Sequence, residues 1–140
     1  MIPTATRRPT VTDQHPAPRI HEDPSLRVVR NDDRERFELW RDEQFIGFEA
    51  FEEHEDGTVE LRTTIVGEQF GRQGYARTLV TMLLEDARAQ GRRVCATCPY
   101  VQEYLHRFPQ YQDLLAPSCE LPPAPAVREK RRRWSLPRAH

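Results

Sequence analysis

The sequence predicts an α+β domain in which helices pack on a mostly antiparallel sheet, flanked by disordered tails. Two observations support this fold class. Short segments in which apolar and charged residues alternate follow one another between residues 26 and 66, as in strands joined by tight turns. A long apolar stripe at helical spacing then precedes another short apolar segment and a second helical pattern. The expected order is therefore three strands, a helix, a strand and a helix.

The strand signals are concentrated between Leu26 and residue 66. Phe37 and Leu39 alternate with charged neighbours, residues 41–44 resemble a turn, and residues 45–51 resume as a strand. Asp56-Gly57 predicts a tight turn before the strand at 58–66, because glycine accepts the positive φ of primed turns. The acidic residues of this region predict a solvated outer face, or alternatively an electrostatic lure for a cationic amine; they are Glu49, Glu52, Glu53, Glu55, Asp56 and Glu60.

The helical part begins with one continuous stripe of apolar residues, Ala76, Leu79, Val80, Leu83, Leu84 and Ala87. Gly91 is expected to end this helix, and residues 92–97 then form a short strand of the same sheet. A second helix is expected over residues 100–107, ending before Pro109.

The 140 residues have room for one domain, whose limits follow from composition. Most of the 12 prolines fall in the first 24 residues or after Leu115, while the apolar periodicity lies between them. We expect a disordered N-terminal tail over residues 1–25 and a compact domain over residues 26–115. Residues 116–140 are expected to form a Pro-rich, basic C-terminal tail.

Charge is divided unevenly along the chain, although the net charge is −1. Residues 26–115 carry 12 arginines and 17 acidic residues, a balance of −5, whereas residues 116–140 carry 6 basic and 2 acidic residues, a balance of +4. The basic run at 128–133 can contact phosphates electrostatically, but such runs are more often solvated ends. Nucleic acid is therefore a disfavoured partner.

The cellular compartment and the lack of a metal site are predicted from sequence features that the chain does not have. No apolar run is long enough to span a membrane, and the first 30 residues lack the apolar core of a secretory signal. An odd number of cysteines, 3, predicts no disulfide framework and a reducing, cytoplasmic compartment. Cys95 and Cys98 form a C-x-x-C pair without further ligands at a zinc spacing, so no metal is expected.

Residues 66–77 join the last predicted strand of the first group to the strongest predicted helix. The small residues Gly71, Gly74 and Ala76 let backbone amides approach an anion, and the first turn of a helix suits a pyrophosphate. Arg72 and Arg77 can add countercharge. A glycine-rich turn of this kind also occurs as a plain tight connection, so both interpretations stay open.

Residues 70–76 (FGRQGYA) resemble the acetyl-CoA signature of the GCN5-related N-acetyltransferases, Arg/Gln-x-x-Gly-x-Gly/Ala, with Gly71 at its first position. Residues 98–105 (CPYVQEYL) and 108–111 (FPQY) resemble a compact single-domain subgroup, the YjdJ-like or N-acetyltransferase domain-containing proteins. This resemblance, which spans about residues 26–115, implies an acyltransferase that moves acetyl from acetyl-CoA to an unidentified amine. It implies that the co-substrate is bound by Ile65, Val66, Gly71, Arg72, Gln73, Gly74, Tyr75, Ala76 and Arg77.

The catalytic residues are less sharply predicted. The subgroup often has Thr-His-Thr-Glu-Val where this chain has Thr63-Thr64-Ile65-Val66, so the His and Glu are missing. The subgroup places a cysteine at Cys98, which can accept the acetyl group if its pKa is lowered, and is otherwise a buried, inert thiol. The resemblance implies that Tyr104 protonates the leaving thiolate, with core packing as the alternative. A non-catalytic acyl-CoA-binding module is the alternative function.

Overall fold

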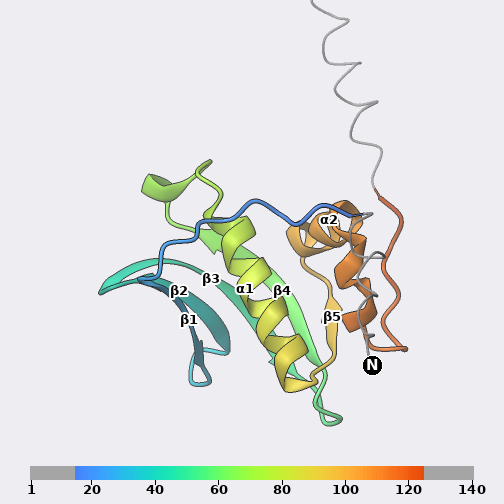
Figure 1. Cartoon of the computed structure of the whole chain (residues 1–140). Helices are drawn as coiled ribbons and strands as arrows, with labels where there is room; N and C mark the ends of the chain where they lie inside the picture. The colour runs from blue at the N-terminus through green and yellow to red at the C-terminus, as the bar shows by residue number, and fades with distance from the viewer. Residues whose placement is uncertain (1–14, 125–140) are drawn as a thin grey trace, which may run out of the picture.

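The structure, a computed structural model, describes residues 15–124. Its elements in chain order are β1 (Leu26–Asn31), β2 (Arg36–Arg41), β3 (Gln44–Glu53), β4 (Val59–Val66), η2 (Glu68–Phe70), α1 (Tyr75–Gln90), β5 (Val94–Ala96), α2 (Pro99–Arg107) and η3 (Pro109–Leu114). They form one sheet in the order β1-β2-β3-β4-β5, antiparallel except that β5 runs parallel to β4. In Figure 1, α1 lies across one face of the sheet and α2 lies beside β5. The predicted α+β fold is confirmed.

The antiparallel part of the sheet has four strands, where the sequence predicts three. The additional strand, β1, pairs with β2 alone, from Leu26 opposite Arg41 to Asn31 opposite Arg36. An edge strand buries little, and here Leu26 is buried while Val29 is 37% exposed. Arginines on both sides of its valines hide the strand pattern in the sequence, because they break the alternation of apolar and polar residues.

The turns and helix ends lie where the sequence predicts them, except that α2 begins one residue earlier, at Pro99. Gly57, in the turn between β3 and β4, has φ of 90°. Helix α1 ends at Gly91, whose φ of 69° lets its N–H reach the carbonyl groups of Ala87 and Arg88. Helix α2 begins with Pro99 at its first position and ends two residues before Pro109. The core between the sheet and α1 contains side chains with no exposed area, Leu39, Ile46, Leu61, Leu79, Val80 and Leu84.

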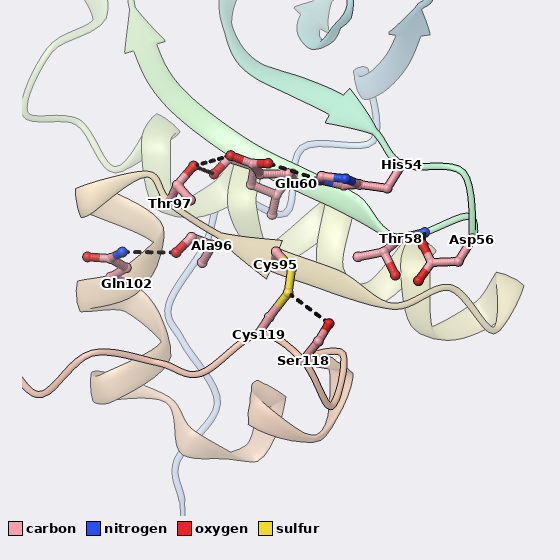
Figure 2. Close-up of a disulfide and its surroundings, with 11 residues drawn as sticks. His54, Asp56, Thr58, Glu60, Cys95, Ala96, Thr97, Gln102, Ser118 and Cys119 are labelled. Atoms are coloured by element: carbon pink, nitrogen blue, oxygen red, sulfur yellow. Dashed lines mark hydrogen bonds and ion pairs between the residues drawn. A yellow bond between two sulfur atoms is a disulfide. The ribbon is translucent and has the colours of Figure 1, made fainter.

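The segment after η3 returns to the free edge of β5. Leu115 forms a parallel bridge with Val94, and the N–H of Ala116 donates to the Val94 carbonyl at 2.9 Å. Cys119 is then joined to Cys95 by a disulfide with the two Cα atoms 5.4 Å apart (Figure 2). The expectation of no disulfide framework is therefore wrong. An odd number of cysteines shows only that the cysteines cannot all be paired within one chain. It does not show that the segment after η3 lies beside β5, which brings Cys119 to Cys95.

This pairing gives a first prediction, for stability. Replacing Cys119 with serine is expected to lower the free energy of unfolding by about 3 kcal/mol under oxidising conditions, because the disulfide closes a chain segment with a sequence separation of 24. Denaturant melts of the parent and Cys119→Ser, with and without reductant, measure this. With reductant the two curves should coincide, and a difference that persists there would assign the loss to packing instead.

The N-terminal segment from residue 15 to residue 25, which the sequence predicts to be disordered, lies against the domain. Figure 1 shows it, in blue, passing from the side of α2 across the beginning of α1 toward β1. The Gln110 side chain donates to the Pro16 carbonyl at 3.2 Å, and Arg77 donates to the Arg19 carbonyl at 3.2 Å. Residues 1–14 of the predicted tail, and the basic run at 128–133, lie outside the described residues. None of the helices within residues 15–124 is long and apolar enough to cross a membrane.

Candidate functional site

The loop between β4 and α1 has the backbone geometry of an anion cradle. After η2 the chain is extended at Gly71, then takes positive φ at Arg72 (62°) and Gly74 (84°). Gly74 is the residue before α1, and no side chain caps that end of the helix. The first turn of α1 also contains no acidic residue. Its amide groups are therefore free to donate to an anion, which the helix dipole favours.

The predicted co-substrate residues contribute in different ways. Gly71, Arg72 and Gln73 are exposed, and the Gln73 side chain donates to the Gln69 carbonyl at 3.0 Å, which steadies the loop. Ala76 and Arg77, in the first turn of α1, are half-buried. The ring of Tyr75 is buried against Phe70, with ring centroids 5.7 Å apart, so only its backbone is available to a ligand.

Ile65 and Val66 lie at the end of β4, where the strand has lost its partner on one side. Of the eight residues of β4, only Val59, Glu60 and Leu61 pair with β5, so β4 continues for five residues beyond its last pair with β5. The Ile65 side chain is 48% exposed, while Val66 is half-buried and packs against the core. Here the two residues can offer backbone groups to a ligand that enters between β4 and the start of α2.

Beside this opening, three side chains from separate elements form a buried cluster. Glu49 of β3 and Thr64 of β4 are register partners, so they share a face of the sheet, and the Thr64 hydroxyl donates to Glu49 Oε1. Cys98, the residue before α2, places its Sγ 3.2 Å from Thr64 Oγ1. The side chain of Glu49 is fully buried and that of Cys98 is 1% exposed. Within residues 15–124, Glu49 Oε2 has no hydrogen-bond partner.

Burial sets the protonation of this cluster. It raises the pKa of Glu49 to about 7, although the hydrogen bond from Thr64 favours the charged form. Burial, and then the nearby charge of Glu49, also raises the pKa of Cys98. A thiolate nucleophile needs the opposite shift. The cluster therefore holds a carboxyl group that titrates near neutral pH beside a thiol that stays protonated.

Tyr104 lies in the interface between the two helices. Its hydroxyl is 2.6 Å from Thr81 Oγ1 of α1, and its ring is 3% exposed and tilted against Phe108 and Tyr111. Burial raises the pKa of Tyr104 to about 12. These contacts are those of a packing residue that joins α1 to α2. Tyr100, four residues earlier, is half-buried and lies near Arg77 at the cradle.

Glu49 is the residue that the sequence interpretation misplaces, since it is assigned to a solvated acidic face. A signal is present in the alternation of β3. Glu49 lies two residues before Phe51, which is 4% exposed, so both side chains point to the core face of the strand. The acidic residues that follow hide this alternation in the sequence. Glu52 and Glu53 are exposed as expected, so Glu49 looks like one more residue of the same exposed acidic group.

Comparisons with known proteins bear on this geometry. A profile of the family described as GCN5-related N-acetyl-transferase matches residues 36–114. A GCN5-like candidate N-acetyltransferase from Staphylococcus aureus, whose solution structure was determined by NMR, is similar with a TM-score of 0.51 and 20% sequence identity. The similarity covers 67% of this chain and 91% of that one. The comparison with curated proteins found no match. The family match extends from β2 to η3 and includes both the cradle and the buried cluster.

Proposed function

Because the chain belongs to the GCN5-related N-acetyltransferase family, we propose that it transfers an acetyl group from acetyl-CoA to an amine. One observation supports this most directly. The uncapped first turn of α1 and the unpaired end of β4 flank the buried cluster of Glu49, Thr64 and Cys98. In this proposal, the helix start binds the anionic part of the ligand and the buried cluster handles the proton.

The residues of the cradle fit the phosphate groups of acetyl-CoA. The turn at Gly74 requires positive φ, and its backbone N–H and those that follow are left without a side-chain partner at the helix start. Arg72 and Arg77 supply positive charge on either side of the turn. The acetyl group would then reach the end of β4, where backbone N–H groups near Ile65 and Val66 can polarise its carbonyl.

Glu49 is proposed to accept the proton that the amine loses when it attacks the thioester carbon. Thr64 links the carboxyl group to the surface, since its hydroxyl donates to Glu49 while its own side chain is only half-buried. A base whose pKa lies near the working pH transfers protons most effectively, and the pKa of Glu49 is about 7. Glu49 thus fills the role left open by Thr63 and Ile65, which stand at the positions of the subgroup's His and Glu.

Cys98 is proposed to act as a proton donor. Its protonated thiol gives its proton to the departing coenzyme thiolate, and the proton that Glu49 has taken from the amine restores the thiol. A covalent acetyl-cysteine would need a thiolate, and burial opposes that charge. The direct path forms no acetyl-enzyme. Mass spectrometry of the protein after incubation with acetyl-CoA alone should therefore show no stoichiometric acetylation of Cys98.

A non-catalytic acyl-CoA-binding module is the second candidate. It is favoured by one observation, that Glu49 and Cys98 both lie beneath the protein surface, so an amine reaches them only through Thr64 or after local opening. Turnover separates the two functions, because a binding module would hold acetyl-CoA without consuming it in the presence of any amine.

Isothermal titration with acetyl-CoA and with free CoA tests the proposed function. The parent should bind both saturably, and Gly74→Glu or Arg72→Glu should weaken binding at least about tenfold, because each places a negative charge in the cradle. Gln90→Glu is the matched control for Gly74→Glu, since it adds the same single negative charge at the exposed far end of α1. No binding by the parent at millimolar ligand would contradict both candidates. Binding without turnover across a panel of amines would leave the binding module.

A further inference from the structure

The N-terminal segment over residues 15–24, here called the strap, docks on the same turn of α1 that forms the cradle. The backbone N–H of His21 donates to Thr78 Oγ1 at 3.0 Å, and the Thr78 hydroxyl donates in turn to the Gly74 carbonyl at 2.9 Å. The Arg77 guanidinium donates to the Arg19 carbonyl at 3.2 Å. The strap is therefore hydrogen-bonded to α1 within one turn of the helix start.

His21 is the central contact of the strap. Its imidazole stacks on the ring of Tyr75, with centroids 4.1 Å apart and an angle of 8° between the planes. Nε2 lies 2.6 Å from the Gln73 carbonyl oxygen, which leaves Nδ1 facing away from that carbonyl. A Cβ built on Gly74 would lie 3.8 Å from Nε2, so the imidazole is in van der Waals range of the cradle backbone.

The position of His21 is fixed from both sides along the chain. Toward the N-terminus, the Arg19 and Pro16 carbonyls accept hydrogen bonds from Arg77 and Gln110. Toward β1, the Asp23 side chain accepts from the Ser25 backbone at 2.9 Å and from its hydroxyl at 2.7 Å. A segment held at both ends loses little conformational freedom when it binds a ligand, so its contacts count more fully toward affinity.

Between the strap and the cradle lies an open hollow of about 360 Å³, lined by Arg19, Ile20, His21, Gln73, Gly74 and Arg77. This lining includes two arginines and a histidine but no acidic residue. Arginine keeps its charge at any pH at which proteins fold, so the hollow attracts anions. The strap docks through its carbonyl groups, the His21 ring and the His21 N–H, which bonds the Thr78 side chain, and it leaves the amides of the first turn of α1 available.

We propose that the strap forms the outer wall of the coenzyme site, with Arg19 and His21 contacting the phosphate groups of an acyl-CoA held in the cradle. This inference rests on the proposed function, since it assigns further contacts to the same ligand. The strap lies outside the residues that match the family, 36–114, so its contribution belongs to this chain's own N-terminal segment.

Titration of the full chain with acetyl-CoA tests this assignment. Arg19→Ala and His21→Phe should each raise the Kd about three- to tenfold, and deletion of residues 1–24 at least tenfold. His21→Phe keeps a ring that can stack on Tyr75 and removes both nitrogen atoms, including the Nε2 contact with the Gln73 carbonyl. Arg34→Ala is the control, because it removes one exposed positive charge in the turn at the far end of β1. The difference between Arg19→Ala and the parent should shrink at high salt.

The outcomes separate this inference from the proposed function. If the parent binds acetyl-CoA and the strap variants bind equally well, the proposed function stands and the strap assignment is overturned. Tighter binding by the strap variants would also overturn it, because the strap would then compete with the ligand for the cradle. Absence of binding by the parent would contradict the proposed function, and the strap assignment with it.

Discussion

Replacing Glu49 with glutamine is expected to lower kcat/KM by about 10²- to 10⁴-fold, while making the fold more stable above neutral pH. The loss of rate follows from removing the proton acceptor, because the amide cannot take the amine's proton. The gain in stability follows from burial. The carboxyl group has an unpartnered oxygen within the described part of the chain, and a neutral side chain of the same shape avoids burying its charge.

The pH dependence has a defined sign. The pKa of Glu49 is raised from 4.5 to about 7, so its contribution to stability is fully present below pH 4.5 and is lost as the pH rises through about 7. The total loss is about 3 kcal/mol, as an order of magnitude. The parent should therefore become less stable relative to Glu49→Gln over this range. Over the same range kcat/KM of the parent should rise, since the base form of Glu49 increases.

Denaturant melts and initial rates over a pH series measure both effects. Glu38→Gln is a matched control, because Glu38 is also a buried carboxyl group but accepts hydrogen bonds from Arg36, Trp40 and Asn31. Although burial opposes it, these bonds hold the pKa of Glu38 below its ordinary value, so its contribution is lost as the pH falls. Glu38→Gln should lose stability and keep its rate. Equal losses of stability in the two variants would show that Glu49 is only structural.

Replacing Gly47 with alanine is expected to destabilise the fold by about 1–3 kcal/mol and to weaken acetyl-CoA binding. A Cβ at this position would lie 2.5 Å from the Ile65 carbonyl oxygen and 2.9 Å from the Val66 Cα. Both are backbone atoms of β4, so relief requires the end of this strand to move. That end is the part of β4 beyond β5, where we place the acetyl group.

Gly67→Ala is the control for this substitution. Gly67 directly follows β4, its φ of −55° suits alanine, and a Cβ there meets its nearest neighbours at 3.4 Å. Loss of backbone freedom in the unfolded chain should make Gly67→Ala neutral or slightly stabilising. Urea melts and acetyl-CoA titrations of both variants are the measurements. If Gly47→Ala binds acetyl-CoA as the parent does, the end of β4 does not contribute to the ligand site.

Much of the fold is predictable because it depends on local signals. The stripe from Ala76 to Ala87 predicts α1, Gly91 marks its end, and Pro109 marks the end of α2. Asp56-Gly57 fixes the hairpin of β3 and β4. In each case one short stretch of sequence determines one helix, turn or strand. The element can therefore be predicted without knowing which other element it packs against.

The remaining features depend on pairing between distant residues. Local alternation places Glu49 on the core face of β3, but its contacts with Thr64 of β4 and the nearby Cys98 depend on strand register and on where α2 begins. The Cys95–Cys119 disulfide requires the segment after η3 to return to β5. The strap is the clearest example, since its proline-rich composition predicts disorder while its contacts are made to α1 more than 50 residues away. Composition indicates only how much surface a segment can bury by itself. It therefore cannot show that the strap packs on a surface formed by other residues.

The positions of the strap and Cys119 have a consequence for how this lineage can change. Both lie outside the residues shared with the family, yet one reaches the cradle and the other reaches β5. A substitution in either flank changes none of residues 36–114, although it can act on the fold through the Cys95–Cys119 disulfide or on the cradle through the strap. In the proposed function, the flanking segments therefore adjust how tightly the ligand is held, while residues 36–114 carry out the chemistry.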